Sequence, residues 1–256
     1  MIKRIMTDVD VKAGINLILK KIDETYANRS KEITSPKPLL VAVSKTKPSQ
    51  MIIEAYSTGQ RHFGENYVQE LIEKGADTEI QSQCPDIRWH FIGHLQKNKI
   101  NKIVNTPNLY MIETVDSQKI ADSLNSALER IQRDDKQPLR VLVQINTSGE
   151  EEKNGVPPTE AVGLYKHISE NLKNLKVDGL MTIGRFGHDY STGPNPDFIV
   201  MMECHRKVCE ELNLEPSSVQ VSMGMSDDFD KAIEMGSTIV RVGSSIFGYR
   251  AKKNAA

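Results

Sequence analysis

The chain has 256 residues, of which 38% are hydrophobic, and its formal net charge is -1 at pH 7. This length suits one α/β barrel, and the near-neutral charge argues against nucleic acid or an anionic membrane surface as a partner. The three cysteines are an odd number without metal-type spacing, so neither a disulfide framework nor a cysteine metal site is expected.

The apolar runs and the amino-terminal residues indicate in which cellular compartment the protein is expected. No run approaches the roughly 18 apolar residues of a membrane span. The opening sequence MIKRIMTDVD lacks the apolar centre of a signal peptide and carries aspartates early. We therefore expect a protein of the cytoplasm, with mitochondria as the alternative.

The first half of the chain alternates helical and strand patterns. Apolar residues at helical spacing predict an amphipathic helix over 7–30, before the breakers Pro36 and Pro38. Short apolar runs then alternate with helical segments, some of which end near glycine. The predicted elements are strand 39–45, helix 49–58, strand 61–66, helix 67–75, a polar loop 76–86, strand 87–93, a basic helix 96–104 and strand 109–115.

The second half repeats the same alternation. Asp116 or Ser117 is a suitable cap for the next helix, and the run LRVLVQIN is the clearest strand of the chain. The longest irregular stretch lies at 184–196. The predicted elements are a helix to about 133, strand 139–146, a helix that follows Pro157 and Pro158 and runs to about 172, strand 177–183, helix 197–212, strand 219–224, helix 227–235 and strand 238–248.

Eight strands separated by helices predict a parallel sheet. The strands are apolar at consecutive positions, as a sheet covered on both faces requires. Eight such units between about residues 39 and 250 predict an α/β fold, a single (β/α)8 TIM-type barrel with an extra N-terminal helix. We expect one domain over 1–256. A doubly wound open sheet is the alternative.

A lysine ends the first predicted strand. Active sites of such barrels lie at the carboxyl ends of the strands, so Lys45 would lie at the barrel mouth with its stem against the core. Desolvation there would lower the pKa of the amine and favour a nucleophile, whereas the alternative is a lysine that extends to solvent. Lys47 lies two residues further on and would face the same side of an extended chain, so spacing does not choose between Lys45 and Lys47.

Small residues end the last two predicted strands. Ser222, Gly224 and Ser226 precede a helix, and Gly243 is followed by two serines. Such turns let backbone N–H groups approach an anion, and barrels commonly hold phosphate after strands seven and eight. The alternative is two tight turns with no ligand.

Three other features have competing interpretations. Arg241 lies inside an apolar strand, where it contacts either a ligand or a barrel carboxylate such as Glu65. His90 and His94 lack the helical geometry of a metal pair, so no metal is expected. The basic run QKNKINK at 96–102 is more typical of a solvated helix face than of a nucleic-acid site, because no aromatic residues interleave with it.

Seven blocks of the sequence resemble the pyridoxal phosphate (PLP) homeostasis protein family, also called YggS-like or proline synthetase co-transcribed homologues. They occur in family order over about 39–250. They are VAVSKTKP, HFGENYVQE, WHFIGHLQKNK, VQIN, GLMTIG, SMGMSDDF and VRVGSSIFGYR. The family fold is similar to the N-terminal barrel of alanine racemase.

The resemblance implies a PLP site at the barrel mouth. Lys45 is expected to form the Schiff base with PLP, with Lys47 as a nearby second amine. The residues expected to bind the remainder of the cofactor are Ser222, Met223, Gly224, Gly243 and Ser244 at the phosphate, Arg241 at the pyridine nitrogen, Asn66 near the ring or the lysine, Met181 against the ring face and His90 as a lining residue.

The resemblance also implies a non-catalytic role in PLP and amino-acid balance. An arginine at the pyridine nitrogen disfavours protonation of that nitrogen and makes PLP a weaker electron sink. The racemase dimer domain is not expected after about residue 250, which favours a monomer. PLP-dependent apo-enzymes are the expected recipients of PLP. The alternatives are a small amino-acid racemase and a phosphosugar-binding barrel without PLP.

Overall fold

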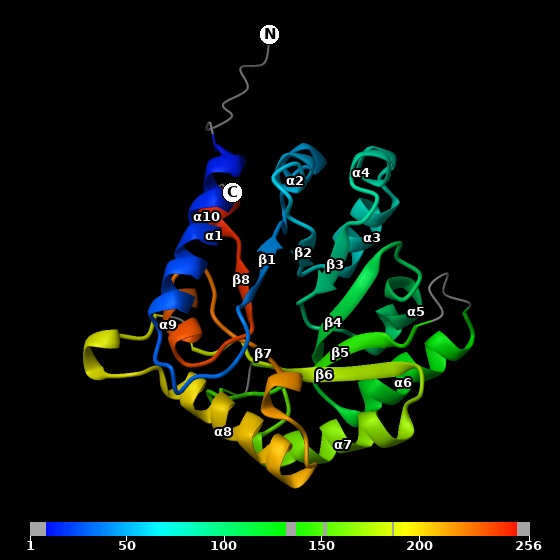
Figure 1. Ribbon diagram of the computed structural model, residues 1–256. Coiled ribbons are helices and arrows are strands. Elements are labelled where there is room, and N and C mark those ends of the chain that lie inside the picture. Colours follow the sequence, from blue (N-terminus) through cyan, green and yellow to red (C-terminus); the bar gives the residue numbers. More distant parts are fainter. Residues whose placement is uncertain (1–8, 132–136, 151–152, 186, 250–256) are drawn as a thin grey trace, which may run out of the picture.

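Eight parallel strands close into a barrel in the computed structural model, which describes residues 9–131, 137–150, 153–185 and 187–249 (Figure 1). The barrel closes where β1 pairs with β8, from Leu39 opposite Ile239 to Ala42 opposite Val242. The barrel prediction is therefore confirmed, and the open-sheet alternative is wrong. The strands are β1 Leu39–Val43, β2 His62–Glu65, β3 Arg88–Phe91, β4 Leu109–Val115, β5 Leu139–Gln144, β6 Leu175–Met181, β7 Gln220–Ser222 and β8 Ile239–Val242.

Helices surround the barrel (Figure 1). The predicted bounds at residues 1, 7, 133, 250 and 256 lie outside the described residues. The α-helices are α1 Val11–Asn28, α2 Ser49–Tyr56, α3 Val68–Ala76, α4 Thr78–Gln83, α5 Ile100–Ile103, α6 Gln118–Glu129, α7 Ala161–Asn171, α8 Pro196–Glu211, α9 Phe229–Glu234 and α10 Ser244–Phe247. Short 3₁₀ turns occur at Lys97–Lys99, Pro158–Glu160, Tyr190–Thr192 and Pro216–Ser218.

Two predicted segments differ from the structure. The predicted loop 76–86 contains α4, because the Asp77 side chain accepts hydrogen bonds from the N–H groups of Glu79 and Ile80 and so caps a helix. The predicted strand 238–248 ends at Val242, and α10 begins directly after Gly243. Isolated short helices such as these give too little hydrophobic periodicity to be recognised from the sequence.

Apolar residues fill two separate layers. Inside the barrel lies a small cluster of inward-facing strand residues, which are Val41, Met111, Leu142, Met181 and Ile239. The larger core lies between the strands and the helices. Alternation along a strand assigns residues to the two layers, so Val41 faces the barrel axis while Leu40 and Ala42 face the helices. Polar residues with inward parity therefore meet inside the barrel.

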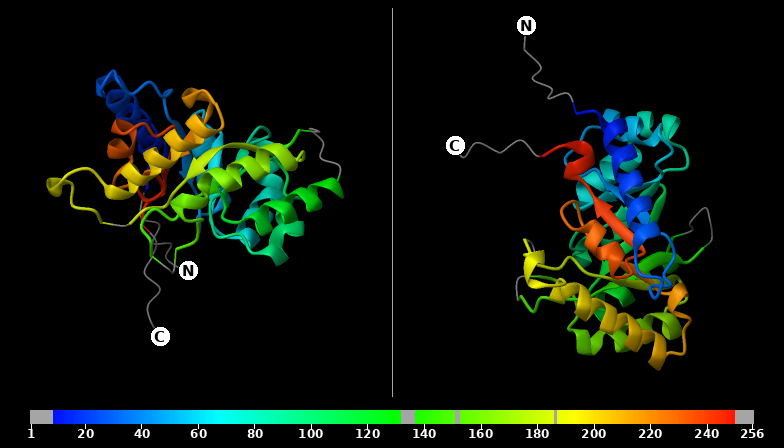
Figure 2. Two further views of the ribbon diagram at one scale, coloured as in Figure 1. Left: turned by 90° about the horizontal axis from the view of Figure 1, so that it is seen from below. Right: turned by 60° about the vertical axis from the view of Figure 1, so that its left-hand side comes forward.

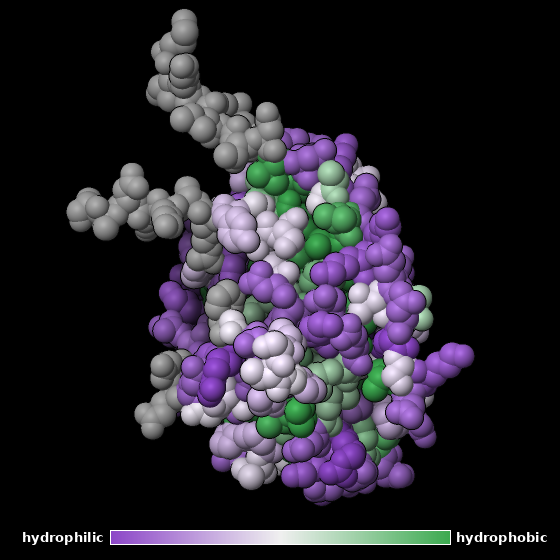
Figure 3. Space-filling model, turned by 90° about the vertical axis from the view of Figure 1, so that its left-hand side faces the viewer, coloured by the Kyte–Doolittle hydropathy of each residue, from purple (hydrophilic) through white to green (hydrophobic). Residues whose placement is uncertain are grey.

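The extra N-terminal helix α1 lies alongside α9 and α10 (Figures 1 and 2). A Cβ atom on Gly14 of α1 would lie 3.0 Å from the carbonyl oxygen of Ile246 in α10, so glycine permits this close approach. The outer surface on this side is mainly hydrophilic, with hydrophobic side chains between the polar ones (Figure 3). Within the described ranges, no helix has the length and apolar character that crossing a membrane requires.

Candidate functional site

Lys45 lies in the turn that follows β1 and is half-buried. Val41 and Val43 precede it with the same parity, and Val41 faces the barrel interior. Continued alternation directs Lys45 toward the axis at the carboxyl end of the barrel. This is the face at which active sites of such barrels lie.

A buried ion pair fixes the turn that carries Lys45. The Nζ atom of Lys74 donates to the carbonyl oxygen of Ser44 and to Oε1 of Glu65, both at 2.8 Å. The Ser44 hydroxyl donates to the same Glu65 oxygen at 2.6 Å. Burial raises the pKa of Glu65, and Lys74 and Ser44 oppose that rise. Thr46, at a φ of 63°, completes the turn with its N–H bound to Glu70.

Lys47 differs from Lys45 in its surroundings. Its Nζ atom donates to the carbonyl oxygen of Gly248 at 2.9 Å and contacts that of Tyr249 at 3.4 Å. These contacts join the turn after β1 to the segment that follows α10. The Lys47 amine therefore has a structural role, which the sequence pattern could not reveal.

The turn after β8 lies directly beside the end of β1. A Cβ atom on Gly243 would lie 3.2 Å from the carbonyl oxygen of Val43, so the two backbones approach closely. The Gly243 N–H donates to the hydroxyl of Ser226 at 3.1 Å. Ser226, Gly243 and Ser244 are all half-buried. Small residues from the turns after β7 and β8 thus meet next to the end of β1, two residues before Lys45.

Gly224 shapes the turn after β7. Its φ of 92° lies in the left-handed region, and a Cβ atom there would lie 2.5 Å from the Cβ atom of Ala232. Its carbonyl oxygen accepts from the N–H of Arg241 at 3.0 Å. The next residue, Met225, donates its N–H to Asp228 at 2.7 Å. A larger residue at Gly224 would therefore displace the turn that carries Ser226.

The side chains of Ser222 and Met223 lie inside the protein, both at 0% exposure. The Ser222 hydroxyl accepts from Arg241 and donates to Glu113, each at 2.6 Å. Met223 packs in the core between the strands and the helices. The hydroxyl that faces the turns is instead that of Ser226, which the sequence pattern placed in this turn but did not distinguish from Ser222.

Arg241 is buried at the base of this site and is 4% exposed. Its NH1 atom donates to Ser222, and its NH2 atom donates to the carbonyl oxygen of Thr182 at 2.7 Å. The alternative that paired Arg241 with Glu65 is wrong, because Glu65 pairs with Lys74. The two hydrogen bonds fix the guanidinium plane inside the barrel.

A chain of hydrogen bonds crosses the barrel interior from Arg88 to Glu113. Arg88 contacts Nε2 of His62 at 3.3 Å, and Nδ1 of His62 lies 2.8 Å from Nε2 of His90. Nδ1 of His90 lies 2.7 Å from Oε1 of Glu113. An arginine only donates, so its contact assigns Nε2 of His62 as an acceptor and Nδ1 of each histidine as a donor.

Glu113 therefore accepts from both directions, since Ser222 donates to its other oxygen. Burial alone would raise the pKa of Glu113, but His90, Arg241 and Ser222 hold it below its usual range. His90, expected as a lining residue of the cofactor, is 0% exposed and uses both ring nitrogens here. The sequence interpretation overlooked Glu113 and His62.

Other sequence candidates occupy different places. The Oδ1 atom of Asn66 is buried and has no hydrogen-bond partner among the described residues, which leaves an acceptor for a ligand. Met181 lies inside the barrel at 0% exposure. His94 lies apart from His90 and contacts Asp116 at 3.4 Å. In the part of the chain that the structure describes, no group of three residues could hold a metal ion.

We expect His62 to make the fold sensitive to acid. Burial lowers the pKa of His62 to about 3, and the charges of His90, Arg88 and Arg140 add to this effect. Between about pH 6.5 and 3 the unfolded chain binds a proton that the folded chain does not, so stability falls as the pH falls through this window. Urea unfolding should show a loss of about 2 kcal/mol between pH 7 and 5 that His62→Gln removes.

The matched control for this titration is His94→Gln, because His94 is 46% exposed. This variant should retain the wild-type dependence of stability on pH. An equal loss of stability in wild type and His62→Gln between pH 7 and 5 would show that His62 is not the titrating group.

Comparisons with known proteins agree with the fold and with the resemblance in the sequence. The family described as alanine racemase, N-terminal domain, matches residues 19–251. The pyridoxal phosphate homeostasis protein of Homo sapiens is 51% identical over 243 residues, which cover 95% of this chain and 88% of the human protein.

Two solved structures extend the comparison. PipY of Synechococcus elongatus PCC7942, solved with PLP bound, has a TM-score of 0.71 and 30% sequence identity, covering 90% of this chain and 100% of its own. Alanine racemase of Corynebacterium glutamicum has a TM-score of 0.61 and 14% identity, covering 97% of this chain and 64% of the racemase. The racemase likeness concerns the fold alone.

Proposed function

This chain belongs to the pyridoxal phosphate homeostasis protein family, and from that premise we propose that it binds PLP and acts in intracellular PLP balance. One observation carries the assignment of the site. The close approach of Gly243 to Val43 brings a turn suited to phosphate next to the end of β1, which leads into the turn that carries Lys45. A reactive amine and an anion site thus lie on the same face of the barrel.

We assign the covalent attachment of PLP to the Nζ atom of Lys45. PLP bound through an amine supplies a conjugated ring that withdraws electrons from the attached nitrogen. The ion pair of Lys74 with Glu65 supports this choice, because it fixes the backbone on which Lys45 stands. Lys47 is the weaker candidate, since its amine binds the carbonyl oxygens of Gly248 and Tyr249.

The phosphate group fits the turns after β7 and β8. We assign it to the backbone around Met223 and Gly224, to Gly243 and Ser244, and to the Ser226 hydroxyl. Short backbone turns with glycine present N–H groups to an anion at close range. We assign Ser222 to a different task, which is to hold Arg241 through its hydroxyl.

Arg241 supports a holding role rather than a catalytic one. Its guanidinium remains charged and only donates, so next to a pyridine nitrogen it disfavours protonation of that nitrogen. Asn66 and Met181 complete the assignment, because the buried Oδ1 atom of Asn66 has no partner among the described residues and Met181 offers an apolar contact for the ring. His90 orients Glu113 through a hydrogen bond. The other oxygen of Glu113 accepts from Ser222, which in turn binds Arg241.

The test is an absorption spectrum of the purified protein before and after borohydride, followed by mapping of the modified peptide. We expect a visible band of lysine-bound PLP that borohydride removes, and one pyridoxyl group on the peptide that contains Lys45. A colourless protein that retains no pyridoxyl group after incubation with PLP would contradict the proposal and favour the phosphosugar-binding alternative.

We further propose that the protein turns over no amino acid. We propose that it is a monomer with a single barrel domain over 1–256, located in the cytoplasm, and that it delivers PLP to PLP-dependent apo-enzymes. Solvent deuterium incorporation at the Cα atom of amino acids tests the first point. Exchange that depends on Lys45 and proceeds over many turnovers would favour the racemase alternative.

A further inference from the structure

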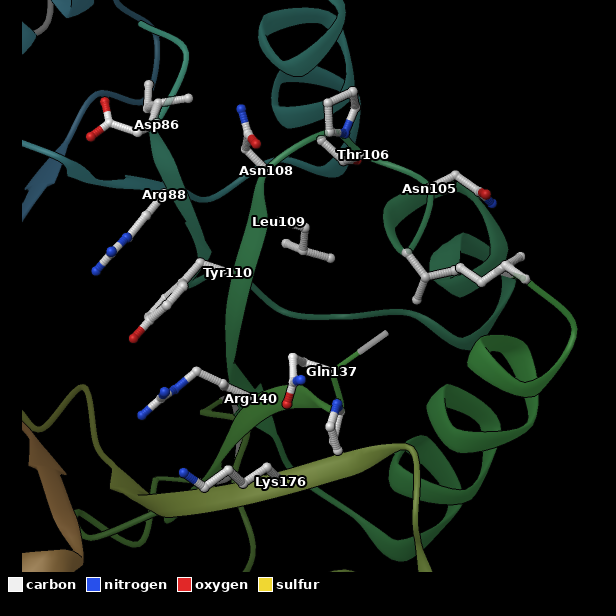
Figure 4. Close-up of a pocket in the computed structure, with 15 residues that line it drawn as sticks. Asp86, Arg88, Asn105, Thr106, Asn108, Leu109, Tyr110, Gln137, Arg140 and Lys176 are labelled. Atoms are coloured by element: carbon white, nitrogen blue, oxygen red, sulfur yellow. The ribbon is translucent and has the colours of Figure 1, made fainter. Parts of the chain in front are cut away.

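A groove of about 630 Å³ opens at the amino-terminal ends of the strands, where the starts of β3 to β6 line it (Figure 4). Because all eight strands are parallel, this face is opposite to the one that carries Lys45. Arg88, Tyr110, Arg140 and Lys176 each come from a different one of these strands and extend toward the same side (Figure 4). The proposed cofactor site uses none of these four residues.

Arg88 contributes a positive charge without a carboxylate partner among the residues that the structure describes. Its contacts are Nε2 of His62 at 3.3 Å and the face of the Tyr110 ring, 5.3 Å from its guanidinium carbon. The acidic residue nearest in sequence, Asp86 at the rim of the groove, pairs with Arg61 at 2.9 Å. The charge of Arg88 is therefore available to a ligand.

Arg140 and Lys176 share a single carboxylate. Both contact Asp178, which is 5% exposed, and Lys176 lies 3.3 Å from its Oδ1 atom. The two cations are also direct neighbours on adjacent strands, because Arg140 and Lys176 are paired in the register of β5 and β6. Like charges at directly opposed positions destabilise a sheet, so a second negative charge here would be stabilising.

The helix ends do not account for these cations. In a barrel of this kind the carboxyl ends of the helices lie on the same face as the strand starts, and basic side chains often bind their last carbonyl groups. Within the described part of the chain, Arg88, Arg140 and Lys176 make no hydrogen bond to a backbone carbonyl. Among the described residues, the polar contacts of these three cations are therefore to His62 and Asp178.

We propose that this groove binds a small multivalent oxyanion, such as a phosphorylated metabolite, between Arg88, Arg140 and Lys176. The Tyr110 ring lies between the two guanidinium groups, whose central carbons are 5.3 and 5.1 Å from its centre. This spacing favours a ligand with two charged groups over one with a single charge. The planar guanidinium groups suit the oxygen atoms of phosphate, and Lys176 adds a third positive charge.

The ligand would also act on the interior of the barrel through Arg88. Arg88 is the first donor of the hydrogen-bond chain that reaches His62 and ends at Glu113. Burial is the largest cause of the low pKa of His62, and the charges of Arg88 and Arg140 lower that pKa further. An oxyanion bound to both arginines would offset these charges, so His62 would bind a proton more readily.

Inorganic pyrophosphate is the probe for this site. The protein is loaded with PLP, treated with borohydride so that the cofactor site stays filled, and titrated by calorimetry at constant ionic strength. We expect one molecule of pyrophosphate to bind per chain, and the double variant Arg88→Gln/Lys176→Gln to weaken the affinity about tenfold or more. The side chains of Arg88 and Lys176 are exposed, so their replacement should preserve the fold.

Lys20→Gln is the matched control, because Lys20 is 72% exposed on α1 and does not line the groove. It should bind pyrophosphate as the wild type does. The ring-proton resonance of His62 at pH 5 should move toward its protonated position on saturation. Three results would each overturn the proposal. They are equal affinity of the wild type and the double variant for pyrophosphate, no binding of pyrophosphate to the wild type, and equal binding of chloride and pyrophosphate.

This test is independent of the assignment of the cofactor site. Should the chain fail to retain PLP, the same titration is made on the unloaded protein, and the difference between wild type and Arg88→Gln/Lys176→Gln still isolates the groove. A loss of pyrophosphate binding in Ser226→Ala but not in the double variant would place the anion at the opposite face and contradict the groove.

Discussion

Replacement of Lys45 by alanine is expected to abolish covalent retention of PLP while the barrel keeps its stability. The wild type should retain about one pyridoxyl group per chain after borohydride, and the variant should retain none, because no other amine replaces the nucleophile. The turn itself is fixed by Lys74, Glu65 and Ser44, so the free energy of unfolding should change by only about 0.5 kcal/mol. Mass spectrometry and urea unfolding measure the two effects.

The matched control is Lys47→Ala, which removes the neighbouring lysine of the same parity. This variant should keep the pyridoxyl group but loosen the segment around Gly248, to which the Lys47 amine donates. Retention of PLP by Lys45→Ala together with its loss in Lys47→Ala would move the attachment site to Lys47.

Glu113→Gln should cause the largest loss of stability of any change proposed. Glu113 is the carboxylate on which the hydrogen bonds of His90 and Ser222 converge, and Arg241 is bound to that same Ser222. The amide keeps the shape of the side chain but removes its charge, which leaves the buried guanidinium without this counter-ion. Breaking a buried ionic arrangement of this kind costs about 3–5 kcal/mol, which urea unfolding at pH 7 would measure.

Glu129→Gln provides the comparison for this loss. Glu129 pairs with Lys173 at 3.2 Å on the surface, where the side chains are 60% and 76% exposed. Exposed pairs contribute about 0–1 kcal/mol, so this change should be nearly neutral. A loss of less than 1 kcal/mol in Glu113→Gln would indicate that another acid, such as Asp228, balances Arg241.

The barrel was predictable because its strands are apolar on consecutive positions. Runs such as LRVLVQIN at 139–146 identify a strand covered on both faces, and eight of them in alternation with helices leave few possible architectures. The elements that escaped prediction are short. Helix α4 depends on the capping contacts of one residue, Asp77, and α10 on a turn at Gly243, neither of which produces a periodic pattern.

The site was predictable only in part, because a turn does not reveal which of its side chains face inward. The spacing of Lys45 and Lys47 left two candidates, and the motif resemblance chose between them. Ser222 and Ser226 lie in one short segment, but the first has inward parity within β7 and the second follows the strand. Glu113 had a signal that was overlooked, since it is an acidic residue inside the apolar strand LYMIETV.

The contact between α1 and α10 would couple the amino-terminal helix to the proposed phosphate turn, and so to the time that PLP stays bound. Gly14 packs against Ile246, which lies two residues after Ser244 in the turn assigned to phosphate. Movement of α1 away from this position would free α10 and open that turn without altering any residue that touches PLP. The proposed transfer of PLP would depend on the dissociation rate as well as on affinity, and this packing contact would be a place where that rate is set.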